Sequence, residues 1–220
     1  MKKTMILLIC LCTSYLFSQQ TGEKEKKHAL AVHLGTGLGL DYSYKINEYF
    51  SATARYSILK YKQEDFDYEI DGKDLLVDGE FDINHIDALF NIAPFGKAFR
   101  FVLGAGYFVK NDVDVTLSFK DEVKIGEVVF TSDDVGNIFI NAQWEGLLPY
   151  AGIAFGRAVP TSGFGFGVEL GTYYDADGPS MSLDATGIIE QTKNQEALLQ
   201  DSFKENKFLP YLSLRLAYSF

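Results

Sequence analysis

Three histidines are the side chains of this sequence best suited to proton transfer near neutral pH: His28, His33 and His85. A hydrolase or acyltransferase would need one of them beside a nucleophile. His28 lies in a polar N-terminal segment, whereas the strand pattern described below places His33 on an inner face and His85 near a rim. We therefore predict no catalytic residue, and we interpret His33 as an interior hydrogen-bonding side chain.

Four charged residues fall on the same inner face of the expected strands: Arg55, Arg100, Glu169 and Arg215. A carboxylate close to guanidinium groups can accept paired hydrogen bonds from them. We interpret the set as a charge network that fills a lumen, and a gate or anion-attracting constriction is the alternative. The facing of Arg157 is left open.

The segment 61–80 is strongly acidic, with eight Asp and Glu residues against Lys62 and Lys73. Its oxygen-bearing side chains partly match the spacing of a calcium-binding loop, and the candidate ligands are Asp67, Glu69, Asp71 and Asp78. Asp74 stands where that motif needs an apolar residue, and no helices are expected on either side. The sequence thus allows a weak divalent-cation site in the 61–80 loop, with a solvated acidic loop as the alternative, and it predicts no cofactor.

Residues 1–18 have the features of a secretory signal peptide. Lys2 and Lys3 precede an apolar run of 13 residues that ends at Phe17, and Ser18 offers a small residue for cleavage. The run is shorter than the roughly 20 residues of a membrane-spanning helix. A lipoprotein is the alternative, although small residues are missing before Cys10. Because Cys10 and Cys12 both lie in this leader, the mature chain is expected to lack disulfides, thiolate catalysis and cysteine metal sites.

The composition excludes one class of partner and favours one class of fold. The 30 acidic residues outnumber the 20 basic ones, so the chain lacks the positive surface that grips nucleic acid. Tyr, Phe and Gly are abundant, with 13, 18 and 20 residues, and this mixture is typical of strands. We expect an all-β protein that binds no nucleic acid.

Large apolar residues alternate with small or polar residues in five segments: 30–44, 51–58, 99–110, 164–174 and 208–220. In the first, the even positions carry Leu, Val or Tyr except at Thr36, and the odd positions include Gly35, Gly37 and Gly39, which are expected within one strand. A face of Gly, Ala and a few charges suits a narrow barrel lumen, and a bulky apolar face suits lipid. A soluble barrel would have the opposite facing and is the alternative.

Several segments together resemble a family of small, largely uncharacterised outer-membrane β-barrel proteins of Gram-negative bacteria. They are Gly35–Leu40, Asn91–Gly96, Phe99–Tyr107, Leu148–Arg157, Phe164–Gly171, Pro179–Gly187 and Leu209–Phe220. The resemblance covers most of the mature chain and implies its location and fold, but it brings no catalytic residues. The last segment also resembles the terminal signal that the outer-membrane assembly machinery reads, with Tyr218 and Phe220 as the signal residues.

The pattern predicts an antiparallel transmembrane β-barrel of eight strands, at 29–46, 50–61, 83–93, 98–110, 136–144, 148–158, 163–174 and 207–220. Long segments lie at 61–80, 110–136 and 175–207, with a small hairpin expected in the second and a short surface helix at 188–204 in the third. Two short turns then follow the first and third strands, whereas a barrel with both ends in the periplasm has its short turns after even strands. Either a strand is miscounted, with the run at 180–185 as a further candidate strand, or the acidic segments face the periplasm.

We therefore expect one domain, residues 19–220, forming a non-enzymatic outer-membrane barrel with a structural or limited transport or binding role. The expected partners are outer-membrane lipids and the barrel assembly machinery. A small pore for ions or solutes, a membrane-embedded lipid-modifying enzyme and a soluble exported lipocalin-like binder are the alternatives.

Overall fold

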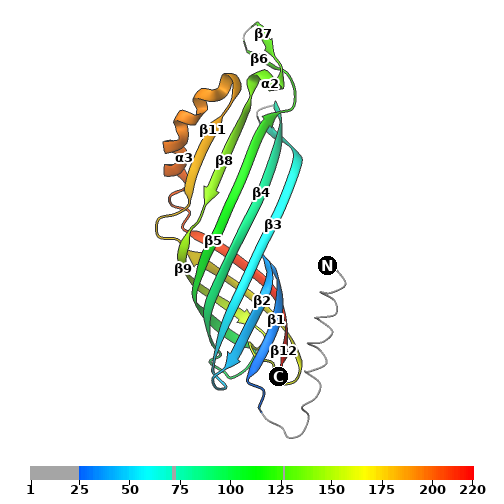
Figure 1. Ribbon diagram of the computed structural model, residues 1–220, viewed down its shortest axis with the longest axis vertical. Helices are drawn as coiled ribbons and strands as arrows, with labels where there is room; N and C mark the ends of the chain where they lie inside the picture. The colour runs from blue at the N-terminus through cyan, green and yellow to red at the C-terminus, as the bar shows by residue number, and fades with distance from the viewer. Residues whose placement is uncertain (1–24, 71–72, 126) are drawn as a thin grey trace, which may run out of the picture.

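The computed structural model describes residues 25–70, 73–125 and 127–220, and shows a narrow barrel with a tall sheet rising from one side (Figure 1). The predicted leader, with Cys10 and Cys12, lies outside the described residues. Eight antiparallel strands form the closed wall: β1 (His28–Gly35), β2 (Leu38–Lys45), β3 (Phe50–Ile70), β4 (Lys73–Ile92), β5 (Phe99–Phe119), β9 (Gly146–Phe155), β10 (Phe164–Tyr174) and β12 (Phe208–Ser219). Each strand pairs with the next in this order, and β12 pairs with β1. The predicted eight-stranded barrel is confirmed.

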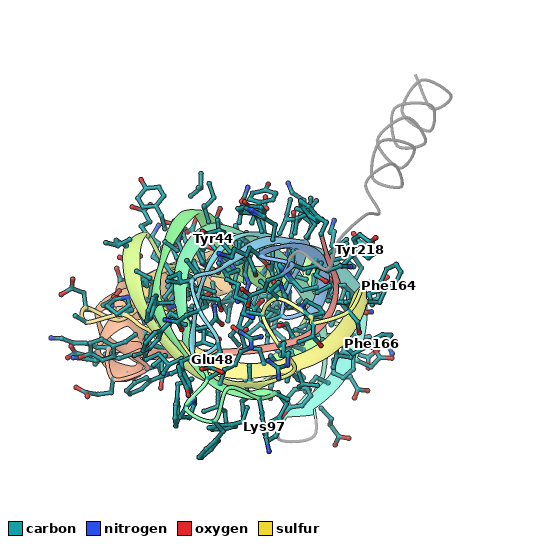
Figure 2. The ribbon with its side chains drawn as sticks, turned by 90° about the horizontal axis from the view of Figure 1, so that it is seen from below. Tyr44, Glu48, Lys97, Phe164, Phe166 and Tyr218 are labelled. Atoms are coloured by element: carbon teal, nitrogen blue, oxygen red, sulfur yellow. The ribbon has the colours of Figure 1, made fainter. Side chains whose placement is uncertain are left out.

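The predicted facing of the wall residues is also confirmed. Large apolar side chains point outward: Phe166 is 80% exposed and Leu214 is 59% exposed, and the ring of Phe164 likewise projects from the wall (Figure 2). Arg215, between Leu214 and Leu216 on β12, is only 5% exposed and points inward. The wall therefore has an apolar outside and a polar or small-residue inside, the pattern of a transmembrane barrel rather than of a soluble one.

The predicted first strand, 29–46, is in fact two strands. β1 and β2 form a hairpin joined by Thr36 and Gly37, and the N–H of Gly35 donates to the carbonyl oxygen of Gly37 at 3.0 Å. A loop of two residues preserves the even and odd alternation from one strand to the next. One uninterrupted pattern in the sequence therefore covers a strand, a turn and a second strand.

The predicted strand at 136–144 is not part of the wall. β8 (Asn137–Gln143) pairs with residues 112–118 of β5, outside the closed ring. The hairpin adds one strand to the wall and the loss of β8 removes one, so the number of wall strands stays at eight. The short turns predicted after the first and third strands therefore follow even-numbered strands. The short connections at 46–49, 93–98 and 156–163 follow the second, fourth and sixth wall strands. They lie at the end of the barrel where the N–H of Phe220 donates to the carbonyl oxygen of His28 at 2.9 Å, and we call this end the short-turn end.

The opposite end carries a second structural unit, which we call the extension sheet. It consists of residues 59–70 of β3, 73–84 of β4 and 110–119 of β5, together with β8 and β11 (Ser180–Ala185). The acidic segment 61–80, expected as a loop, is therefore mostly the upper parts of β3 and β4. A small hairpin lies above the sheet, as predicted, formed by β6 (Val123–Ile125) and β7 (Val128–Phe130), and α2 (Ser132–Val135) follows it.

The helical segment predicted at 188–204 begins as a 3-10 helix, η1 (Gly187–Gln195), and continues as α3 (Glu196–Phe203). Side chains of α3 bond the free edge of β11: Met181 N–H donates to Gln200 Oε1 at 2.7 Å, and Leu183 N–H donates to Glu196 Oε2 at 3.1 Å. α3 therefore covers one open edge of the extension sheet. Among the described residues, no helix has both the length and the hydropathy to cross a bilayer.

Candidate functional site

Polar side chains meet in the middle of the barrel, and each wall strand supplies at least one of them. We call this set the lumen network: His33 on β1, Asp41 on β2, Arg55 on β3, Asp87 on β4, Arg100 on β5, Tyr150 on β9, Glu169 on β10 and Arg215 on β12. All eight side chains are buried. They occupy positions whose chain neighbours point out of the barrel, so the strand alternation itself directs them into the lumen.

Arg55 lies at the centre of the network. Its Nη1 and Nη2 donate to the two carboxylate oxygens of Glu169, each at 3.0 Å, and its Nε donates to Asp41 Oδ1 at 3.1 Å. Asp41 and Arg55 are also direct neighbours in the register of β2 and β3. Paired N–H···O bonds between a guanidinium and a carboxylate fix both groups in position. Arg55 thus connects β2, β3 and β10 across the lumen.

Arg215 and Arg100 extend the network toward the short-turn end. Arg215 Nε donates to Asp41 Oδ2 at 2.7 Å, and its Nη1 donates to the carbonyl oxygen of Ala158 at 3.0 Å. Arg100 Nε donates to the carbonyl oxygen of Gly156 at 2.9 Å, and its Nη2 lies 3.6 Å from Glu169 Oε2. The two arginines therefore bind the connection between β9 and β10 at the short-turn end of the lumen.

The four charged residues predicted from the sequence, Arg55, Arg100, Glu169 and Arg215, are brought together in this network. Two acidic members, Asp41 and Asp87, were not predicted. Three arginines against one glutamate leave two positive charges without a counter-ion, and buried charges without a partner are costly. That imbalance, combined with strand phase, was the available signal. With Asp41 and Asp87 the network holds three guanidinium and three carboxylate groups.

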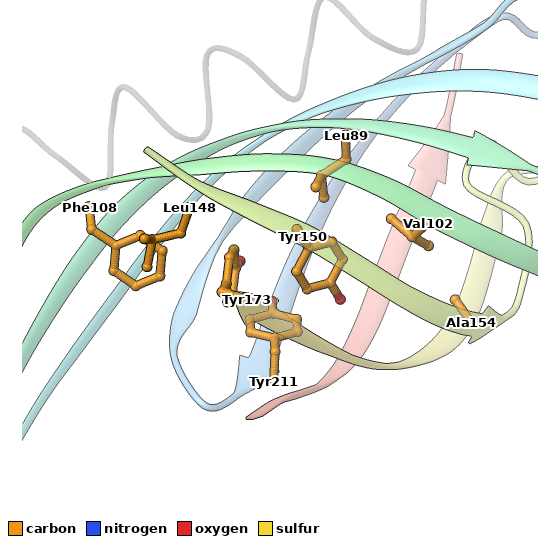
Figure 3. Packing of buried hydrophobic residues seen from close by; sticks show 8 residues of the cluster. All are labelled: Leu89, Val102, Phe108, Leu148, Tyr150, Ala154, Tyr173 and Tyr211. Atoms are coloured by element: carbon orange, nitrogen blue, oxygen red, sulfur yellow. The ribbon is translucent and has the colours of Figure 1, made fainter. Parts of the chain in front are cut away.

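Tyrosine rings close the lumen beside the charges. Tyr150 OH donates to Glu169 Oε1 at 2.8 Å, and Tyr173 OH donates to Asp87 Oδ2 at 2.9 Å. The Tyr150 and Tyr173 rings lie 4.7 Å apart, and the Tyr211 ring packs close to both (Figure 3). The Arg55 guanidinium lies 4.8 Å from the Tyr211 ring centroid, a cation–π contact. Since all three rings are buried, they fill the lumen at this level.

His33 has a partner on each ring nitrogen. Nδ1 lies 2.9 Å from Asp41 Oδ1, and Nε2 lies 3.3 Å from the hydroxyl oxygen of Ser57. The order Ser57, His33, Asp41 is that of a catalytic triad. However, Ser57 and His33 are each 1% exposed, and the same Asp41 carboxylate is bound by two arginines. This geometry gives a substrate no access to Ser57, and His33 functions as an interior hydrogen-bonding side chain.

The other two histidines lie apart from His33. His85 Nδ1 lies 2.8 Å from Asp87 Oδ1, and its ring stacks on Phe108 at 4.8 Å between centroids. His28 lies at the short-turn end, where its Nδ1 is 2.7 Å from the hydroxyl oxygen of Tyr42. The described geometry therefore places no two histidines in one site.

The short-turn end of the barrel contains a small cavity of about 30 Å³, lined by Arg100, Arg157, Lys45, Lys97 and Asn91 among others. Arg157, whose facing was left open, is located here. A cavity of this size holds about one or two water molecules.

The four candidate cation ligands do not form a site in the part of the chain that the structure describes. Asp71 lies outside the described residues. Asp67 accepts a hydrogen bond from Lys120 Nζ at 2.7 Å, and this bond raises the pKa of Lys120. Asp78 Oδ1 accepts from the backbone N–H of Asp65 at 2.8 Å, and Glu69 lies opposite Asp74 in the register. Across the described residues, no group of three His, Cys, Asp or Glu side chains is arranged to hold a metal ion.

Tyr218 and Phe220, the predicted assembly signal, lie at the end of β12. The ring of Phe220 is exposed, and the Tyr218 ring lies 4.9 Å from that of Phe164 on the outer surface (Figure 2). Both residues therefore belong to the aromatic outer surface at the short-turn end.

A scan against protein-family models and a search of curated proteins find no match to this chain. Solved structures do match. CarO from Acinetobacter baumannii is 20% identical, with a TM-score of 0.66 over 91% of this chain and 100% of the other. CarO2 from the same organism is 19% identical, with a TM-score of 0.68 over 90% of this chain and 100% of the other. At this level of identity the comparison shows a shared fold, so this chain has the barrel architecture of the CarO structures.

Proposed function

We propose that this chain is an outer-membrane barrel of the family that its sequence resembles, and that it is a non-enzymatic protein with a sealed lumen. In this proposal the barrel anchors the extension sheet at the cell surface. Any transport or binding role is carried by the surface beyond the lumen network. The observation that carries the proposal is that every wall strand contributes a buried side chain to one charge-balanced network.

The outer surface of the wall supports the membrane location. Exposed Leu, Val, Ile and Phe side chains cover it, and tyrosines such as Tyr42, Tyr44 and Tyr218 lie toward the short-turn end. Aromatic residues at the border of an apolar band are typical of barrels in a bilayer. Outer-membrane lipids would cover this band. We further propose that residues 1–18 are removed on export and that the assembly machinery recognises Tyr218 and Phe220.

The filled lumen distinguishes a sealed barrel from a small pore. In planar bilayers the purified protein should give no discrete single-channel currents, because ion pairs and tyrosine rings block the path. Discrete currents that change in Arg100→Gln, while Lys204→Gln at an exposed position after α3 leaves them unchanged, would establish a pore instead.

Heat modifiability tests the barrel itself. A folded barrel extracted in mild detergent should migrate differently on a denaturing gel before and after boiling. Identical migration would refute the membrane barrel, and recovery of the mature protein in the supernatant without detergent would favour a soluble binder. Altered lipopolysaccharide in a deletion strain, restored by the wild type but not by His33→Ala, would favour a lipid-modifying enzyme.

A further inference from the structure

The two free edges of the extension sheet differ. The β11 edge is covered by α3, whose Gln200 and Glu196 side chains accept its N–H groups. The β3 edge is open: β2 pairs with β3 only as far as Ile58, and among the described residues no strand pairs with that side of β3 beyond it. An uncovered edge of this length is a template for another strand.

The open edge also has an apolar side. Tyr61, Phe66 and Tyr68 are each more than half exposed, although they lie on the face that continues the inside of the barrel. A bulge between Gln63 and Phe66 keeps them on one face, because it inserts one extra residue and so changes the parity of the strand. The opposite face carries Lys60 and Lys62 before the bulge, and Asp67 and Glu69 after it.

Edge charges usually prevent strand pairing, but the order of these charges makes the strand complementary to itself. When two copies of β3 are aligned antiparallel about the Glu64–Asp65 bulge, Lys60 of each faces Glu69 of the other, and Lys62 faces Asp67. In the same register Tyr61 faces Tyr68 on the apolar side. Opposite charges and aromatic rings are both favourable cross-strand pairs. The bulge of each copy lies at the two-fold axis that relates the copies, so the pairing has the same register on either side of the bulges.

We infer that the open β3 edge pairs with the β3 edge of a second copy of this chain in a facing membrane. The inference rests on the proposed outer-membrane location. β3 runs from the barrel wall outward, so copies in one membrane extend their β3 edges in the same direction. An antiparallel partner has its barrel at the opposite end of the paired strands. The structure thus assigns this edge to contact between two membrane surfaces.

The ion pairs that the β3 charges form within one copy do not prevent pairing with a second copy. Lys60 Nζ lies 3.2 Å from Asp82 Oδ2, Lys62 Nζ lies 2.7 Å from Glu64 Oε1, and Asp67 is bound to Lys120. The lysines in these pairs are substantially exposed, and exposed ion pairs contribute little stability. Their long side chains can change partners when a second strand arrives.

A charge exchange between two vesicle populations tests the register. The purified protein is inserted into phosphatidylcholine vesicles, and clustering is measured by light scattering. One variant carries Lys60→Glu with Lys62→Glu, and the other carries Asp67→Lys with Glu69→Lys. Wild-type vesicles should cluster, vesicles of either variant alone should lose clustering, and a mixture of the two variants should regain it. The control, Glu190→Lys with Asp201→Lys on η1 and α3, should cluster like the wild type.

Heat modifiability measured on the same vesicles separates the two proposals. Protein that does not shift on boiling contradicts the membrane barrel itself. Protein that shifts normally, but whose wild-type vesicles do not cluster, overturns the β3 pairing. So does clustering of either variant alone, or a mixture that fails to cluster. A second readout is a disulfide between Tyr61→Cys on one population and Tyr68→Cys on the other, with no cross-link between two Tyr61→Cys populations.

Discussion

Arg55 and Glu169 face each other across the lumen through two parallel hydrogen bonds of 3.0 Å, although 114 residues separate them in the chain. Both side chains are almost fully buried. We expect Glu169→Gln to leave the Arg55 charge without its main counter-ion and to lower the free energy of unfolding by about 3–5 kcal/mol. Urea unfolding in detergent, followed by the fluorescence of Trp144, measures this loss.

Glu145 provides the matched control, because it is an exposed glutamate. Glu145→Gln should change the unfolding free energy by less than about 0.5 kcal/mol. Equal effects of the two substitutions would contradict a stabilising role for the lumen network.

Asp41 and Asp87 should differ in their contribution to stability. Asp41 holds Arg55, Arg215 and His33 within 3.1 Å, whereas Asp87 binds His85 and Tyr173 closely and lies 3.8 Å from Arg55. We expect Asp41→Asn to cost about 3–5 kcal/mol and Asp87→Asn about 1–3 kcal/mol, since the first removes the counter-ion of two arginines. The same unfolding measurement compares them, and a larger loss for Asp87→Asn would contradict this ranking.

Gly104 should not tolerate a larger side chain. A Cβ atom there would lie 2.1 Å from the carbonyl oxygen of Ala88 and 2.9 Å from Leu89 Cα, both of them backbone atoms. Gly104→Ala should therefore lower the unfolding free energy by about 1–3 kcal/mol. At Gly79 the nearest atom to such a Cβ is the Phe81 ring at 3.8 Å, so Gly79→Ala should be neutral or stabilising by up to about 1 kcal/mol. Equal changes in the free energy of unfolding for Gly104→Ala and Gly79→Ala would contradict this prediction.

The cover of the β11 edge can be measured locally. In Glu196→Ala with Gln200→Ala, the amides of Met181 and Leu183 lose their acceptors. Hydrogen exchange at these two amides should become at least about tenfold faster, which corresponds to about 1.4 kcal/mol of lost protection. Asp201→Ala, an exposed position on the same helix, should leave both rates unchanged. Unchanged rates in the double variant would show that α3 does not protect this edge.

The class of fold could be predicted from the sequence because the two sides of the wall face different surroundings, lipid outside and a polar lumen inside. Alternation between Leu or Phe and Gly or a charge reports that facing directly, and it located Arg55, Arg100, Glu169 and Arg215 on the inner side. It could not detect the turn at Thr36 and Gly37, because a turn of two residues leaves the parity unchanged. The first strand was therefore predicted as one element, although it is a hairpin.

The extension sheet was missed for the opposite reason. The bulge between Gln63 and Phe66 changes the parity in the middle of β3 and interrupts the alternation that identifies a strand. The many acidic residues on the outer face then gave 61–80 the composition of a loop. Asp41 and Asp87 were missed because strand phase alone does not say which inward carboxylates meet. The predicted set held three arginines and one glutamate, and this excess of positive charge would have indicated that further inward carboxylates were needed.

The contribution of every wall strand to the lumen network links charge balance to the closure of the wall. Without β12, the carboxylates of the network outnumber its guanidinium groups by three to two, because Arg215 is on that strand. β12 supplies the third guanidinium, which binds Asp41, and the same strand pairs with β1. Neutralisation of the lumen and circular closure of the wall therefore depend on one segment.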